Sequence, residues 1–266
     1  RCAGDGDLPL IENQVNMGKR KIFIAAAVLW GLSLFGLDRH WHGLVLGMLA
    51  GLLAVSLLGP PQDIWAGLAH TAPPFLFVLS ASLVFVYFPN FGFLFKLVLI
   101  LVFVVAFYAI LLSQNIFRVA AERGTRFPLF RAAQTSSFLL ALFSAFLFLA
   151  ALYKSSLPLV LQVLLGIVGA SWLAFSHLWF SYQDSQAISV RSLLSGALLI
   201  GLGVGELGLA FSFLPIKSFF RALALATGFY IGLGFYKQVL EHTFNRKFLI
   251  EHLVVAVSVA LILLIL

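Results

Sequence analysis

The side chains best suited to chemistry in this sequence are a few charged and amide groups set inside long apolar runs. Glu206 is the deepest of them, because it lies in the segment GLGVGELG, eight residues before the end of an expected helix. At helical rise that distance is about 12 Å. An ionised carboxylate at this depth costs on the order of 3 kcal/mol unless it has a partner or a proton. We therefore expect Glu206 to pair with a cation or to serve a binding or proton-coupled site.

Arg221 is the expected partner of Glu206. Pro215 separates two apolar runs that would form an antiparallel hairpin, and Arg221 lies about one turn into the returning helix. Gln162 and Lys96 are expected at similar depths, near the starts of their own helices. Two interpretations follow: a structural ion pair that fixes the hairpin, or a substrate-binding site for a small anionic or lipid-like molecule formed by Glu206, Arg221, Gln162 and Lys96.

Glycines surround Glu206 at positions 201, 203, 205 and 208. Each glycine weakens a helix. Transporters use unwound membrane segments to expose backbone polar groups at binding sites. The glycine density therefore favours the binding interpretation over the purely structural one.

The elements that must position these residues are membrane-spanning helices. Hydrophobic residues make up 62% of the chain and charged residues 10%, which is too few charges to cover a soluble surface. A span needs about 20 mostly apolar residues. We predict an all-α, polytopic helix bundle with one transmembrane domain over residues 17–266, and an upstream or disordered tail over residues 1–16. The nine predicted spans are 22–37, 43–58, 74–88, 92–114, 133–153, 157–181, 190–214, 217–237 and 248–266.

Prolines support these boundaries. We expect Pro73 and Pro74 in the first turn of the third span, where a missing N–H costs little, and no proline inside any span. The preceding segment, 62–72, is too short to cross a membrane. It is predicted to lie along the membrane interface.

Basic residues predict the orientation. With the N-terminus in the cytoplasm, the breaks on that side hold eleven Lys and Arg residues and the opposite breaks hold five. This bias is the positive-inside pattern. The largest basic loop contains Arg118, Arg123, Arg126 and Arg131, which we expect to contact anionic lipid headgroups. The short loops indicate a bacterial-type plasma membrane, and the net positive charge reflects lipid contact rather than nucleic acid.

Small residues recur at four-residue spacing, which lets membrane helices approach closely. The stripes are Gly43, Gly47 and Gly51; Gly201 and Gly205; Gly228 and Gly232. We expect tight packing within the chain, with homo- or hetero-oligomerisation as the alternative.

The predicted cytoplasmic face carries histidines, carboxylates and a tyrosine: His177, Tyr182, Asp184, Glu241, His242, Glu251 and His252. Their spacing does not place metal ligands on one helix face. We therefore expect a solvated, lipid-facing edge there, with no metal and no cofactor.

No catalytic or nucleotide-binding signature stands out in the sequence. Three functional hypotheses remain. The first is a carrier or binder of an anionic or lipid-like substrate, the second a non-catalytic scaffold or assembly subunit. The third is a membrane enzyme acting on lipid-linked substrates, for which no catalytic residues can be named.

Overall fold

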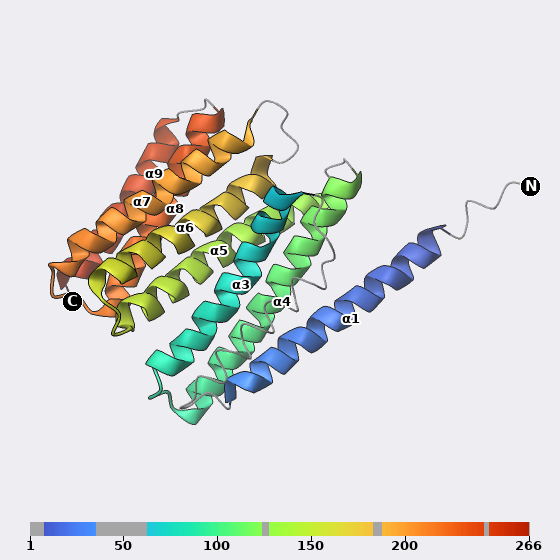
Figure 1. Ribbon diagram of the computed structural model, residues 1–266, viewed down its shortest axis with the longest axis horizontal. Coiled ribbons are helices and arrows are strands. Elements are labelled where there is room, and N and C mark those ends of the chain that lie inside the picture. The colour runs from blue at the N-terminus through green and yellow to red at the C-terminus, as the bar shows by residue number, and fades with distance from the viewer. Residues whose placement is uncertain (1–7, 36–62, 124–127, 183–187, 242–244, 266) are drawn as a thin grey trace, which may run out of the picture.

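In the computed structural model, residues 8–35, 63–123, 128–182, 188–241 and 245–265 are described, and every regular element in these ranges is an α-helix. The helices are α1 (Leu8–Phe35), α3 (Ile64–Tyr87), α4 (Phe93–Arg123), α5 (Pro128–Lys154), α6 (Leu159–Tyr182), α7 (Val190–Ser212), α8 (Ser218–Glu241) and α9 (Arg246–Ile265). Figure 1 shows them side by side, with α1 at one edge of the bundle and α7, α8 and α9 at the other. The predicted all-helical fold is confirmed.

Six helices, α3 to α8, are long and apolar enough to cross a membrane. The outer face of α4 carries exposed Leu94, Val98, Leu101 and Val105, a lipid-facing stripe at helical spacing. The chain is a membrane-embedded, multi-pass protein. The count of nine spans is not confirmed: α1 supplies only a shorter apolar stretch, Lys21–Leu34, α9 is not among the six, and 43–58 lies outside the described residues. The cytoplasmic N-terminus and the plasma membrane stay predictions, as does the tail over 1–16, within which α1 begins.

The prediction for the third span was wrong at its start. Helix α3 runs unbroken from Ile64 to Tyr87, so residues 64–72 form its first turns, and Pro73 and Pro74 lie inside it. A proline at position 73 has no N–H for the carbonyl of Ala69, four residues earlier. The Ser176 hydroxyl on α6 donates to that carbonyl instead, at 2.7 Å. Trp172 Nε1, also on α6, donates to the adjacent carbonyl of Leu68 at 2.9 Å.

Two apolar clusters hold the bundle together, and α3, α4 and α5 contribute to both. One joins these helices to α1, where Trp30 packs edge-on against Phe107 of α4 at 5.0 Å. The other joins them to α6, α7 and α8. Helices α6 and α7 approach closely, since a Cβ on Gly201 would stand 2.6 Å from the carbonyl oxygen of Ile167. The Gly201 and Gly205 stripe therefore packs within the chain, whereas the stripe at 43–51 lies outside the described residues.

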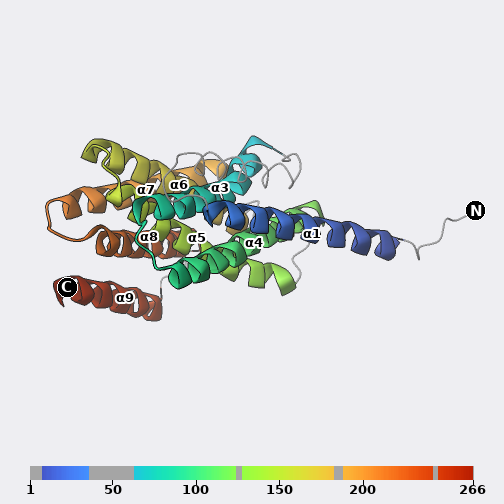
Figure 2. The same ribbon diagram turned by 90° about the horizontal axis from the view of Figure 1, so that it is seen from below.

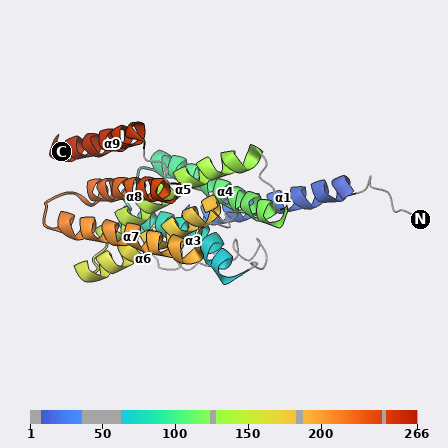
Figure 3. The ribbon, with the colours of Figure 1, turned by 90° about the horizontal axis from the view of Figure 1, so that it is seen from above.

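Among the described helices, α8 is the one against which α9 packs extensively. Figures 2 and 3 show it beside α8 and apart from the rest of the bundle. The contact is made by aromatic rings, with Phe248 and His252 of α9 against Tyr230 and Phe235 of α8. His252 of α9 also lines a cavity that forms the candidate site.

Candidate ligand-binding site

Glu206 lies on the outer side of α7, exposed, in an open groove of about 740 Å³ between α7 and α8. The groove is lined mostly by aliphatic and glycine residues. Gly201, Gly205 and Gly208 face the interior, where Ser171, Ile167 and Tyr153 contact them. Since successive residues of a helix are 100° apart, Glu206 turns away from that face.

Arg221 does not pair with Glu206: among the described residues, no ion pair within 4.0 Å joins them. The Arg221 guanidinium instead lies over the ring of Tyr153 on α5, with Cζ 5.4 Å from the ring centroid. Its Nε is buried with no hydrogen-bond partner in the described part of the chain. Gly208 leaves room for the Tyr153 hydroxyl, so α5, α7 and α8 meet at this point.

Gln162 and Lys96 make contacts different from those of Glu206 and Arg221. The Gln162 Nε2 donates to the carbonyls of Ser155 at 3.0 Å and Leu157 at 3.1 Å, which closes the turn between α5 and α6. Lys96 is buried, with Nζ 5.9 Å from the ring centroid of Phe85 on α3. The groove that Glu206 lines contains none of the other three residues. The role of the four residues in substrate binding stays a prediction.

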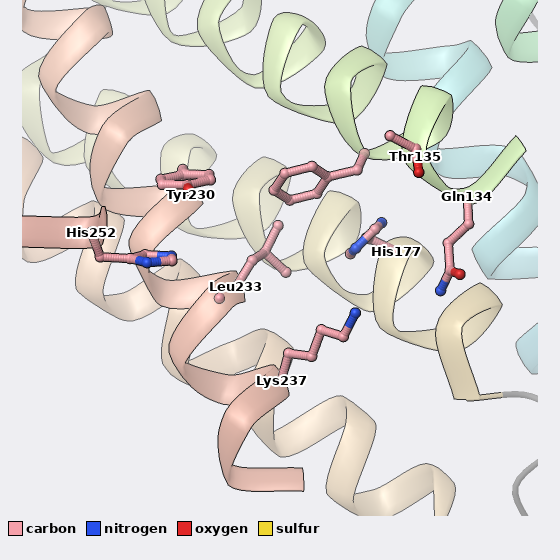
Figure 4. A pocket seen from close by; sticks show the side chains of 9 residues that line it. Gln134, Thr135, His177, Tyr230, Leu233, Lys237 and His252 are labelled. Carbon is pink, nitrogen blue, oxygen red and sulfur yellow. The ribbon is translucent and has the colours of Figure 1, made fainter. Parts of the chain in front are cut away.

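A separate cavity of about 290 Å³ lies where α6 and α8 end and α5 and α9 begin. We call it the polar cavity, and Figure 4 shows the side chains around it. It is lined by Gln134, Thr135, Phe138, His177, Tyr230, Leu233, Gly234, Lys237 and His252. Four helices contribute to it: α5, α6, α8 and α9.

Helices α5 and α6 position His177. The Gln134 Nε2 on α5 donates to Ser181 Oγ on α6 at 3.0 Å, which ties the two helices together at this end. Phe138, one turn further along α5, packs against the His177 ring with centroids 5.0 Å apart. The imidazole points into the polar cavity (Figure 4).

Helices α8 and α9 position His252, which is 6% exposed. Its ring is stacked on Tyr230, and its Nδ1 is 2.9 Å from the carbonyl oxygen of Phe248. A carbonyl only accepts, so Nδ1 carries the hydrogen and, in the neutral ring, Nε2 carries the lone pair. That Nε2 lies against Gly234 and is buried with no hydrogen-bond partner among the described residues.

Lys237 places a positively charged ammonium in the lining of the polar cavity. Its ammonium is directed toward His177 (Figure 4). Glu241, one turn further along α8, has Oε1 3.9 Å from Lys237 Nζ and accepts a 2.9 Å hydrogen bond from the Tyr182 hydroxyl. The carboxylate is thus held beside the cavity, and the described lining itself contains none. An ammonium, two imidazoles, an amide and hydroxyls without a carboxylate form a set suited to an anion.

The sequence drew attention to His177 and His252 but did not bring them together with Lys237. His252 was expected on a solvated, lipid-facing edge, and that expectation was wrong because the ring is buried between α8 and α9. A signal was present: Tyr230, Gly234 and Lys237 share one face of α8 at helical spacing. Asp184 and His242 lie outside the described residues. No group of three His, Cys, Asp or Glu side chains in the described ranges could hold a metal ion.

The predicted headgroup-binding loop is described only at its ends. Arg131 is exposed at the start of α5, and Arg118 lies on α4 with a contact of its own. The side chains of Arg123 and Arg126 lie outside the described residues. Contact of these four residues with lipid headgroups stays a prediction.

Comparison with known proteins gives one match. The model of a family described as "Protein of unknown function (DUF5656)" matches residues 24–266. No curated protein and no solved structure matches the chain. The match spans all the helices that build the polar cavity.

Proposed function

We propose that this chain, which belongs to the family of unknown function DUF5656, binds an anionic group of the phosphate class in the polar cavity. The observation that carries the proposal is the described lining of the cavity, which holds the Lys237 ammonium and the imidazoles of His177 and His252 but no carboxylate. Cationic and N–H donors without a competing acceptor in the lining are suited to an anion.

The donors in the lining favour phosphate over a singly charged carboxylate. A phosphate monoester carries up to two negative charges and three acceptor oxygens near neutral pH. Its anionic oxygens accept from Lys237 Nζ and from the imidazole N–H of His177.

The cavity's place in the fold supports this assignment. Lys237 lies one turn from the end of a helix long enough to cross a membrane, and Glu241 and Tyr182 beside it are at the surface. A ligand group in the cavity therefore lies at the level where phosphate headgroups of a bilayer meet water. This corresponds to the first of the three functional hypotheses, a carrier or binder.

Thermal unfolding in a neutral detergent tests the proposal, with inorganic phosphate compared against chloride at equal ionic strength. A ligand present at about a hundred times its Kd stabilises the folded state by about 2.7 kcal/mol. We expect phosphate to raise the Tm of the wild type and of Lys217→Gln, a matched change of an exposed lysine at the other end of α8. Lys237→Gln should lose the shift, and acetate should give a smaller shift than phosphate.

Two results would contradict the proposal. One is a wild-type protein whose Tm phosphate does not change. The other is a shift that survives in Lys237→Gln as fully as in Lys217→Gln. Either result favours the alternative of a scaffold without a ligand.

A further inference from the structure

A second hollow, of about 370 Å³, adjoins the polar cavity between α5 and α8. We call it the apolar groove. Its lining is Leu142, Phe143, Phe146, Leu223, Ala226, Thr227, Tyr230 and Val255. Tyr230 lines both hollows, so the polar cavity and the apolar groove adjoin at this residue.

The groove offers almost nothing to a polar ligand. Its two polar side chains are Thr227 and Tyr230, and the Thr227 hydroxyl already donates to the Leu223 carbonyl at 2.9 Å. The rest of the described lining is aliphatic or aromatic. A polar group placed there would lose its hydrogen bonds with water, whereas a hydrocarbon would not.

We infer that the ligand is a long-chain amphiphile with a phosphate headgroup, whose hydrocarbon chain lies in the apolar groove. This inference rests on the proposed function of the polar cavity. Lys237, Tyr230 and Leu223 follow one another along α8 at intervals of two turns, about 10 Å each. The proposed headgroup site and chain site thus follow one another along a helix that can cross a membrane. A bilayer lipid has the same orientation.

The groove follows α8 from Tyr230 to Leu223, a distance of roughly 10 Å along the helix. The groove is open along one side, so a chain can enter from the bilayer.

Photolabelling in phosphatidylcholine nanodiscs tests this placement. The probe is hexadecyl phosphate with a diazirine in its chain, and a diazirine-bearing hexadecanol is the control for partitioning without charge. We expect the phosphate probe to label peptides of α5 and α8 that contain groove residues. The labelling should fall at least tenfold in Lys237→Gln and persist in Lys217→Gln.

A groove-filling variant separates the chain site from the headgroup site. Ala226→Phe places a ring in the apolar groove, while Ala210→Phe makes the same change on α7, at the groove beside Glu206. We expect Ala226→Phe to lose labelling by the long-chain probe and to keep its stabilisation by inorganic phosphate. Ala210→Phe should keep both. The wild-type labelling map decides the question without any groove variant, so a misfolded Ala226→Phe does not prevent the test.

Each outcome bears on a different claim. If phosphate stabilises the protein but the probe labels all lipid-facing helices as hexadecanol does, the chain does not lie in the groove and this inference is overturned. The proposed function would then stand. If neither inorganic phosphate nor hexadecyl phosphate depends on Lys237, both the inference and the proposed function fail.

Discussion

The ring of His252 lies flat against the ring of Tyr230, with centroids 4.8 Å apart and planes 5° apart. This stacked pair joins α9 to α8, and its Tyr230 lines both the polar cavity and the apolar groove. The imidazole reaches this position because Gly234, one turn along α8 from Tyr230, has no side chain in its way. One glycine therefore decides both how α9 docks and where Nε2 of His252 points.

Gly234→Ala should loosen α9. The added Cβ would collide with His252 Nε2 and would stand 3.1 Å from Phe248 Cζ, so both rings must move. Overpacking of this kind typically costs about 1–3 kcal/mol. We expect faster amide hydrogen exchange over residues 246–265, with exchange in α7 unchanged. Unaltered exchange in α9 would mean that the stacked pair does not fix the helix.

Gly201→Ala should destabilise the bundle, whereas Gly203→Ala on the same helix should not. At position 201 the new Cβ meets the Ile167 carbonyl at 2.6 Å, a backbone atom that cannot turn aside. At position 203 nothing lies within 4 Å. We expect a loss of about 1–3 kcal/mol in unfolding free energy for Gly201→Ala. Gly203→Ala should gain up to about 1 kcal/mol from helix propensity. Equal losses in denaturant titrations would show that close approach of α6 and α7 does not matter.

Ser176→Ala should cost stability that Ser171→Ala does not. Both serines are buried on α6, but only the Ser176 hydroxyl has a partner, the Ala69 carbonyl that Pro73 leaves without a donor. Removing that donor leaves a buried carbonyl unsatisfied, at a cost of about 1–3 kcal/mol. The Ser171 hydroxyl is buried without a partner in the described part of the chain, so its removal should be neutral or stabilising. Comparison of the two melting temperatures measures the difference directly.

Glu206→Gln, Arg221→Gln and the double variant form a cycle that tests for the predicted ion pair. Because no ion pair joins the two side chains and Arg221 lies over Tyr153, we expect their effects on unfolding free energy to add within about 0.5 kcal/mol. Glu206→Gln alone should leave stability unchanged or raise it, since it removes a charge from an apolar groove. A coupling energy above about 1 kcal/mol would restore the predicted pair.

The sequence predicted an all-helical fold. It also predicted membrane insertion, because long apolar segments with so few charges cannot form the surface of a soluble protein. It failed at Pro73 and Pro74. Pro73 leaves the Ala69 carbonyl without its helical donor, and here the Ser176 hydroxyl of α6, about a hundred residues away along the chain, supplies one. Local rules contain no information about such a partner.

The predicted ion pair between Glu206 and Arg221 was wrong for a different reason. Helical rise gives the depth of Glu206 and Arg221, but their pairing also depends on the rotation of each helix about its axis. The glycines at 201, 205 and 208 indicated which face of α7 turns inward, and Glu206 is not on that face. His252 could not be assigned from sequence, because its burial depends on Gly234 of another helix.

The most direct test of a phosphate site is the distance between phosphorus and Lys237 Nζ, measured by solid-state NMR on protein with ¹⁵N-labelled lysine in nanodiscs containing hexadecyl phosphate. A charge-assisted hydrogen bond between an ammonium and a phosphate oxygen puts the two nuclei about 4 Å apart. We predict dephasing of one lysine signal at that distance, present in Lys217→Gln and absent in Lys237→Gln. Absence of any such contact in the wild type, or its loss in Lys217→Gln instead, would contradict phosphate binding in the polar cavity.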